Sequence, residues 1–271
     1  MNYDKIISLV YEAGKLAFVE NLDAKIKNDN PNDFVTAVDT AISDFLKEAL
    51  YKECPDVGFV TEEENDHDYK QKSFILDPID GTTNLIYDYK MSSVSLAYQE
   101  GGDVKFGVVY NPFSKEIFFA IEGRGAHLYK ADNGLDELLS IGVENYTQGK
   151  LSASSRPIDR SIIEFGATVS NKSIADQTFD RAKRVFKACV DLRRTCSTAL
   201  AISYIAAGRL DGYFEISIKP WDYAAAILIL AEAGGTSCNW QGERLPLDKN
   251  GSIIACNKVI RDDLLKLVNQ E

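Results

Sequence analysis

Residues 74–86, "FILDPIDGTTNLI", contain two aspartates directly after a short apolar run. The run at 74–76 is typical of a buried strand, and Asp77 is predicted to end it. Asp80 follows three positions later, after a proline that stiffens the turn, and Gly81 lets the backbone approach a ligand closely. Two carboxylates that share a small space raise one another's pKa unless a cation lies between them. A hard divalent ion such as Mg²⁺, usually bound beside a phosphate, is the cation that such oxygen ligands accept.

The residues after Gly81 extend this interpretation toward phosphate chemistry. Thr82 and Thr83 are predicted to cap a short helix, whose free N–H groups suit a phosphate. Together with the two aspartates, this helix start indicates metal-assisted hydrolysis of a phosphate ester. For the short motif alone, a well-capped turn with surface acids explains the same residues.

The composition limits the possible partners. The chain has 271 residues, with 41 acidic against 30 basic side chains and a net charge of −11. That balance argues against a general binder of nucleic acid or of an anionic membrane, which needs a basic face. The longest apolar stretch, 224–231, is far too short to span a bilayer, and the first residues show no basic leader or cleavage site. We therefore expect no nucleic-acid partner, no membrane association and no secretion.

The cysteines point to the cytoplasm. They are odd in number and form no CxxC pair: Cys54, Cys189, Cys196, Cys238 and Cys256. Reduced thiols in a cytoplasmic protein account for them most simply.

Several familiar chemistries are excluded by their motifs. The sequence contains no GxxxxGK[ST] phosphate loop and no GxGxxG, HExxH or GxSxG pattern. Its two histidines, His67 and His127, are too few for a histidine-rich metal site. A calcium-binding loop that starts at Asp77 also fails, because its third and twelfth positions are Ile79 and Asp88. A cluster of oxygen ligands remains.

The chain is predicted to consist of two halves, 1–145 and 146–271, with the polar segment 130–150 as the boundary. The first half is predicted to contain helices over 3–20 and from Val38 to Pro55, a polar turn at 28–33, a strand over 57–60 and an antiparallel meander over 93–129. The second half is predicted to alternate strands with helices: strands at 162–169, 211–216 and 252–256, helices at 175–188, 197–207 and 221–233, and a closing helix. This alternation predicts a layered sheet-and-helix architecture.

Four motifs occur together along the chain: "DFVTAVD" (33–39), "GFVTEEE" (58–64), "DPIDGTTN" (77–84) and "WDYAAAILILAEAGG" (221–235). In this order and spacing the chain resembles the inositol monophosphatase family over nearly its whole length. Members of that family are Mg²⁺-dependent, lithium-sensitive phosphatases of sugar and inositol phosphates. The resemblance implies an α+β fold, the layered α-β-α-β-α sandwich of the inositol monophosphatase and fructose-1,6-bisphosphatase type.

The resemblance also implies roles for individual residues. The implied ligands of two or three Mg²⁺ ions are Glu62, Asp77, the backbone carbonyl of Ile79, Asp80 and Asp222. Glu62 and the Asp39–Thr82 pair are the implied catalytic residues, which support the attacking water. The implied substrate-binding residues are Asp80, Gly81, Thr82, Ser197, Thr198, Glu215 and Asp222. Among them, Gly81 and Thr82 hold the phosphate and Glu215 grips a substrate hydroxyl.

Two positions depart from a simple transfer of the family pattern. Three glutamates follow "GFVT", and the resemblance selects the first, Glu62, as the ligand. If the strand before them continues, Glu62 and Glu64 point to one face and Glu63 to the other. Cys196 replaces the glycine expected beside Ser197, which puts the pocket that faces the sugar in question rather than the metal chemistry.

The leading hypothesis is a Mg²⁺-dependent phosphomonoesterase that hydrolyses inositol monophosphate or a similar sugar phosphate. Fructose 1,6-bisphosphate, 3′-phosphoadenosine 5′-phosphate and histidinol phosphate are the alternative substrates within the same superfamily. A catalytically silent, metal-binding regulatory protein on this fold is the alternative from another class, and the intact ligand set argues against it. A homodimer is expected from the family resemblance alone.

Overall fold

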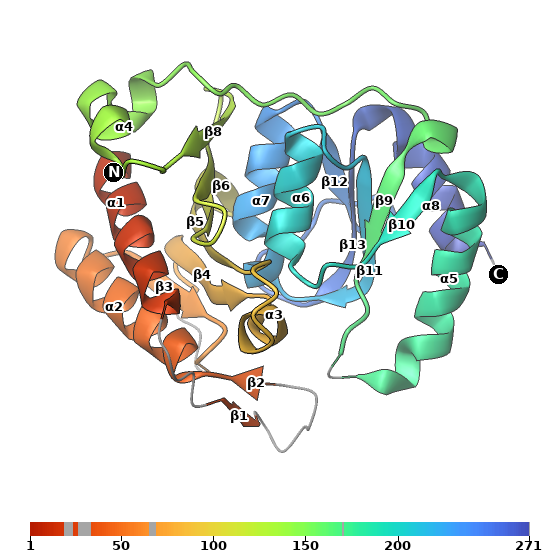
Figure 1. Cartoon of the computed structure of the whole chain (residues 1–271), viewed down its shortest axis with the longest axis horizontal. Coiled ribbons are helices and arrows are strands. Elements are labelled where there is room, and N and C mark those ends of the chain that lie inside the picture. The colour runs from red at the N-terminus through yellow and green to blue at the C-terminus, as the bar shows by residue number, and fades with distance from the viewer. Residues whose placement is uncertain (19–23, 27–33, 65–68, 170, 271) are drawn as a thin grey trace.

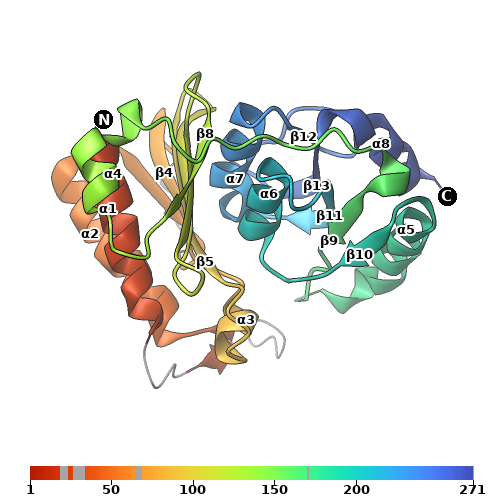
Figure 2. The same ribbon diagram turned by 45° about the horizontal axis from the view of Figure 1, so that its top comes forward.

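The computed structural model describes residues 1–18, 24–26, 34–64, 69–169 and 171–270. Its elements form five layers, which Figures 1 and 2 show from two directions. The layers are, in order, a helix pair, a six-stranded sheet, a second helix pair, a five-stranded sheet and a third helix pair. The predicted α+β sandwich of α-β-α-β-α type is therefore confirmed.

The first half of the chain supplies the first two layers. Helices α1 (Tyr3–Gly14) and α2 (Ala37–Glu53) cover the outer face of the six-stranded sheet. Its strands lie in chain order: β3 (Gly58–Thr61), β4 (Lys72–Asp80), β5 (Ser93–Glu100), β6 (Asp103–Asn111), β7 (Glu116–Ile121) and β8 (Ala126–Lys130). β3 and β4 pair in parallel, and every later pair is antiparallel, as predicted for the meander.

The second half supplies the remaining layers. Its sheet has the strand order β10-β9-β11-β13-β12, with bounds β9 (Ile162–Phe165), β10 (Asp191–Arg193), β11 (Gly212–Ile218), β12 (Thr236–Cys238) and β13 (Gly251–Cys256). The helices α6 (Thr198–Ala206) and α7 (Pro220–Glu232) lie between the two sheets, and α5 (Ala175–Ala188) and α8 (Arg261–Asn269) cover the outer face.

Buried apolar residues form one cluster at each helix-containing layer. The middle cluster joins the inner faces of both sheets to α6 and α7. Because α7 has a sheet on each side, its sequence "AAAILILA" is apolar around the whole helix rather than on one stripe. This shared core fixes the position of α7, and with it one wall of the site described below. No helix in the described part of the chain is both long and apolar enough to cross a bilayer.

Some predicted boundaries are wrong. α1 ends at Gly14 and continues only as a 3₁₀ turn (Lys15–Ala17), whereas the prediction extended to residue 20. β9 ends at Phe165, four residues before the predicted end. The segment 130–150 contains a short helix, α4 (Asp136–Ile141), and a 3₁₀ turn (Val143–Asn145). The predicted turn at 28–33 lies outside the described residues. The strands β1 (Lys25–Ile26), β2 (Phe34–Val35), β10 and β12 were not predicted, because two or three residues are too short to show a period.

The prediction that Asp77 ends its strand is also wrong, and the correction explains the motif. β4 continues to Asp80, but its pairing with β5 shifts between the two aspartates: Asp77 lies opposite Ser95, and Asp80 opposite Ser93. One extra residue on β4 forms a bulge. Pro78 has no N–H to donate to the sheet, and a bulge is a position where proline is tolerated. Without the bulge, side chains three positions apart would face opposite sides of the sheet. The bulge turns both carboxylates toward the same space.

Candidate active site

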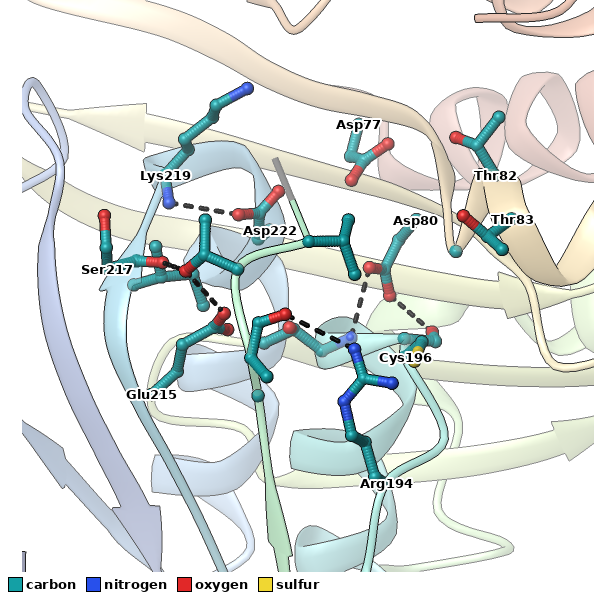
Figure 3. A pocket seen from close by; sticks show the side chains of 18 of the residues that line it. Asp77, Asp80, Thr82, Thr83, Arg194, Cys196, Glu215, Ser217, Lys219 and Asp222 are labelled. Atoms are coloured by element: carbon teal, nitrogen blue, oxygen red, sulfur yellow. Dashed lines mark hydrogen bonds between the residues drawn. The ribbon is translucent and has the colours of Figure 1, made fainter. Parts of the chain in front are cut away.

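A cavity of about 440 Å³ opens where the end of β4 meets α6, α7 and β11. Figure 3 shows acidic side chains from β4, β11 and α7 pointing into it. The cavity brings together most of the residues predicted from the sequence: Glu62, Asp77, Ile79, Asp80, Gly81, Thr82, Ser197, Thr198, Glu215 and Asp222. Asp39 is the exception and lies behind the cavity wall, in contact with Thr82.

Asp222 faces Asp77 and Asp80 from the start of α7. Pro220 occupies the first turn of that helix, where its missing N–H costs nothing. Asp222 follows in the same turn, and its Oδ2 accepts a hydrogen bond of 3.0 Å from the backbone N–H of Lys219. The cap therefore fixes a third buried carboxylate at the cavity.

Glu62 is a fourth acid at the cavity, and its position distinguishes it from Glu63 and Glu64. β3 ends at Thr61, so the strand does not continue and its alternation does not decide their directions. Glu62, 19% exposed, lines the cavity and lies 3.3 Å from the Lys219 ammonium. Glu64 instead pairs with Lys47 of α2, on another face of the sheet. Glu63 does not line the cavity.

Burial and mutual repulsion raise the pKa values of the three aspartates at the cavity. Burial, followed by the charges of Glu62 and Asp80, raises the pKa of both Asp77 and Asp222 well above the usual range. Burial also raises the pKa of Asp80 to about 6, although hydrogen bonds from α6 oppose it. Buried carboxylates with raised pKa values gain most from a cation that stabilises their ionised forms.

The donor set fits a hard divalent cation. All candidate ligands are oxygens. Asp77 Oδ1 is buried and has no hydrogen-bond partner in the described part of the chain, so it is an acceptor available to a ligand. As the side chains stand, no three His, Cys, Asp or Glu side chains within the described ranges converge into a ready metal cage. Asp80 and Asp222 are held by backbone N–H groups, and Lys219 supplies positive charge at Glu62. Metal binding would therefore require small rotations of these side chains.

Thr82 does not cap α3 (Thr82–Ile86) with its side chain, contrary to the prediction for the two threonines. The N-cap is Gly81, whose φ of +92° favours glycine, and no side chain bonds to the free N–H groups there. A Cβ at Gly81 would lie 2.9 Å from the Met91 carbonyl, which also requires glycine.

Thr82 Oγ1 instead lies 3.2 Å from Asp39 Oδ1 and 3.1 Å from the Ile79 carbonyl. The other oxygen of Asp39 accepts hydrogen bonds from the N–H and hydroxyl of Thr36, which begin α2 in a capping box. Burial raises the pKa of Asp39 to about 6. The predicted Asp39–Thr82 contact is thus present in the structure.

The segment before α6 holds Asp80 from the opposite side of the cavity. Asp80 Oδ2 accepts hydrogen bonds from Ser197 Oγ (2.5 Å) and Ala199 N (2.8 Å), and Oδ1 accepts one from Thr198 N (3.1 Å). Anions are favoured at helix starts, so this arrangement stabilises a charged Asp80. Cys196 precedes these residues with φ +63°, the left-handed conformation in which the expected glycine is strain-free.

Glu215 lies deeper in the cavity, on β11. Its Oε2 accepts a hydrogen bond of 2.6 Å from the Tyr213 hydroxyl, and its Oε1 accepts one of 3.2 Å from Thr168 Oγ1. Burial raises the pKa of Glu215 to about 7. Gly166 packs directly over this pair, because a Cβ there would lie 2.2 Å from Glu215 Oε2. Glu215 is therefore a fixed, buried acceptor rather than a surface acid at the end of a strand.

Several cavity residues were not predicted. Glu164, Tyr213 and Thr168 line or support the cavity, and none belongs to the four motifs. Glu164 carried a signal, since a glutamate inside the apolar strand "IIEF" needs a buried polar environment. Tyr213 carried none, because a tyrosine in a strand is ordinary core composition.

Comparison with known proteins agrees with this geometry. The model of the inositol monophosphatase family matches residues 4–271. Nus factor SuhB of Pasteurella multocida is 32% identical over 250 residues, which are 92% of this chain and 86% of that protein. An inositol-1-monophosphatase of Mesorhizobium japonicum is 31% identical over 254 residues, 93% of this chain and 88% of that protein. The crystal structure of extragenic suppressor protein SuhB from Bartonella henselae superposes with a TM-score of 0.85 at 28% identity, covering 99% of this chain and 98% of that one. The chain belongs to the inositol monophosphatase family.

Proposed function

We propose that this protein is a Mg²⁺-dependent phosphomonoesterase that hydrolyses inositol monophosphate or a similar sugar phosphate. The observation that carries the proposal is the acid cluster of Glu62, Asp77, Asp80 and Asp222. Its buried Asp77 Oδ1 has no hydrogen-bond partner within the residues that the structure describes. Burying like charges costs free energy unless a cation compensates them, so a purely structural role does not explain the cluster.

The proposed metal ligands are Glu62, Asp77, the carbonyl of Ile79, Asp80 and Asp222, for two or three Mg²⁺ ions. The chemistry that Mg²⁺ supplies at such ligands is the activation of a water molecule and the neutralisation of phosphate charge. The chain's own part is to hold these oxygens in place. The β4 bulge, the cap of α7 and the N–H groups of α6 do so for the three aspartates.

The Asp39–Thr82 pair is proposed to orient the attacking water together with Glu62. Thr82 Oγ1 has one hydrogen, with Asp39 Oδ1 and the Ile79 carbonyl as its two acceptors, and its lone pairs can accept a hydrogen bond from water. A pKa of about 6 for Asp39 suits a group that receives a proton near neutral pH. Gly81 and Thr82 are proposed to hold the phosphate through their backbone.

The organic part of the substrate is proposed to lie toward β11. Glu215 accepts hydrogen bonds there, and Ser197 and Thr198 form the adjacent wall. Asp80 and Asp222 are proposed to contact the substrate as well as the metal, because both face the same cavity.

The environment and partners follow as proposals. All five cysteines lie in the described residues and none is paired, which supports a reducing compartment, the cytoplasm. The net charge of −11 supports a small-molecule partner rather than nucleic acid or membrane. A homodimer is proposed from family membership.

The test is phosphate release from a panel of esters, with Mg²⁺ and with excess chelator. The panel consists of inositol 1-phosphate, fructose 1,6-bisphosphate, 3′-phosphoadenosine 5′-phosphate and histidinol phosphate. We expect the first to be the best substrate, no turnover in chelator, and inhibition by lithium. Full activity in chelator would overturn the proposal. A folded protein that binds Mg²⁺ but hydrolyses no ester would support the silent regulatory role. The name of the SuhB relative, Nus factor, is the reason to test for that role.

A further inference from the structure

We propose that Glu164 is a second hydroxyl acceptor in the substrate cavity, which selects phosphate esters whose organic part carries several hydroxyl groups. The inference rests on the proposed phosphatase function and deepens it, because it assigns a specificity-determining residue to the same cavity.

Sheet register places Glu164 beside the other polar groups of the cavity. Glu164 on β9 lies opposite Tyr213 on the parallel neighbour β11. Side chains at paired positions share a face of the sheet, and so do residues two apart on one strand. Glu164, Tyr213 and Glu215 therefore face the same side, whereas Ile163 and Phe165 belong to the apolar cluster on the other side.

Only half of the Glu164 carboxylate is used by the protein. The side chain is 1% exposed, and its Oε1 accepts hydrogen bonds from Thr195 N (2.7 Å) and Thr195 Oγ1 (2.6 Å). Its Oε2 is buried and has no hydrogen-bond partner among the described residues, although Glu164 lines the cavity. An unsatisfied buried acceptor destabilises the fold, and more so when it is charged, so a ligand that donates a hydrogen bond accounts for it best.

The carboxylate is held rigidly for such a contact. Thr195, its partner, is itself fixed because its carbonyl accepts a hydrogen bond of 2.6 Å from Asn84 at α3. Asn84 also donates to the Met91 carbonyl at 2.7 Å, so its amide cannot turn freely. Glu164 thus has one orientation, and a fixed acceptor loses little entropy when a substrate binds.

The polar side chains on the cavity walls indicate which kind of ligand fits. Glu164, Glu215 and Asp80 all line the cavity, and the cations Arg194 and Lys219 lie on its wall as well. Carboxylates on the wall can accept hydroxyl hydrogens from a substrate. A phosphate ester with several hydroxyl groups on its organic part, such as a cyclitol or sugar monophosphate, fits this pattern.

The test compares Glu164→Gln with the unmodified protein on two esters, inositol 1-phosphate and 4-nitrophenyl phosphate, which has no hydroxyl group on its organic part. Loss of one hydrogen bond to a charged group predicts a fall of about tenfold in kcat/KM for the inositol ester. The aryl ester should change less than twofold. The ratio of the two kcat/KM values is the readout, because partial unfolding of a variant cancels in it.

Glu116→Gln serves as the matched control. Glu116, on β7, is also a buried glutamate, but it lies outside the cavity and pairs with Arg209 and Lys130. The ratio of the kcat/KM values for the two esters should be the same in Glu116→Gln as in the unmodified protein. An unchanged ratio in Glu164→Gln would overturn the inference, and an equal loss on both esters would assign Glu164 to positioning of the Thr195 segment instead.

Calorimetric binding of inositol 1-phosphate separates this inference from the proposed function. Suppose that the protein binds the ester tightly, that Glu164→Gln binds it about tenfold more weakly, and that neither releases phosphate. The inference about Glu164 would then hold, and the proposed phosphatase function would be wrong. A protein that hydrolyses the aryl ester but binds no inositol 1-phosphate would support the phosphatase function and overturn the inference about Glu164.

Discussion

Burial of Glu215 links the pH of the solution to the stability of the fold. Its pKa is raised by burial from 4.5 to about 7, so the folded state retains a proton that the unfolded state has lost. The contribution is fully present below pH 4.5 and is lost as pH rises through 7. A shift of this size corresponds to roughly 3 kcal/mol.

We therefore expect Glu215→Gln to become more stable relative to the unmodified protein as pH rises from 4.5 to 8. Gln can still accept the Tyr213 hydrogen bond but carries no charge. Urea unfolding of both proteins at pH 5 and pH 8 measures the difference. A stability difference that does not grow with pH would mean that Glu215 ionises in the fold without penalty.

The three consecutive glutamates provide a prediction on activity. Glu62 lines the cavity, whereas Glu64 pairs with Lys47 on a partly exposed surface. Glu62→Gln should lose most turnover and require more Mg²⁺, because small misplacements of reacting groups cost on the order of a hundredfold in rate. Glu64→Gln should stay near the unmodified rate, and Glu63→Gln should fall between them. Initial rates over a Mg²⁺ titration check this, and an inactive Glu64→Gln with an active Glu62→Gln would reverse the assignment.

Single residues also show how far a sequence predicts a site. The acids of the four motifs were predicted because their spacing is specific and their chemistry is unusual in a core. The cap predicted for Thr82 was wrong, whereas the Asp39–Thr82 pair that the resemblance implies is in contact. Whether a threonine caps a helix or bonds to Asp39 depends on α2, which begins 45 positions before it. Glu164 was missed because its partners, Thr195 and Tyr213, become neighbours only through sheet pairing.

At the level of elements, β6 and α7 pack closely against each other. Gly107 has no room for a side chain, because a Cβ there would lie 2.5 Å from the Ala225 carbonyl of α7. Gly107→Ala should therefore push α7 from the sheet and cost on the order of 1–3 kcal/mol, the usual range for overpacking.

Gly251 on β13 is the matched control for that variant. It is also a strand glycine without a positive φ, and a Cβ there would meet nothing within 4 Å. Gly251→Ala should leave the melting temperature unchanged or slightly raised. Equal melting temperatures for the two variants would show that α7 can move away from β6 without cost.

The elements that were predicted well are those whose periodicity extends over several turns or strand residues. α2, α5 and the meander match their predicted ranges to within a few residues, because one buried face imposes a repeating pattern. The bulge in β4 could not be predicted in this way. A one-residue shift in pairing leaves no mark in the apolar pattern of the strand itself, and it depends on the partner β5.

On the scale of the whole molecule, the two halves share one core. The boundary between 1–145 and 146–271 stays a prediction, but the middle apolar cluster contains residues of both halves, on either side of α7. Separate halves would each expose that surface to water. We therefore expect one cooperative unfolding transition, with fluorescence and circular dichroism curves that coincide. Two resolved transitions would show that the halves are independent domains.

The acid cluster should make global stability depend on divalent cations. Burial and like charges raise the pKa of Asp222, so its contribution to stability is lost as pH rises through that pKa. Above neutral pH and in chelator, Asp222→Asn should melt at a higher temperature than the unmodified protein. With Mg²⁺ at a hundred times its Kd, the unmodified protein should gain about 2.7 kcal/mol. Asp222→Asn should gain little and lose turnover, so the order of the two melting temperatures should reverse.

Asp80→Asn is the comparison that separates charge repulsion from hydrogen bonding. Both oxygens of Asp80 accept hydrogen bonds from the start of α6, whereas only Oδ2 of Asp222 accepts one from a backbone N–H. An amide at position 80 would direct its own donors at those N–H groups, so this variant should lose both the Mg²⁺ response and apo stability. Calorimetric melting at pH 8, with and without Mg²⁺, distinguishes the two variants. If Asp222→Asn melted lower than the unmodified protein in chelator, repulsion among the acids would be too weak to require a cation, and the cluster would not indicate a metal site.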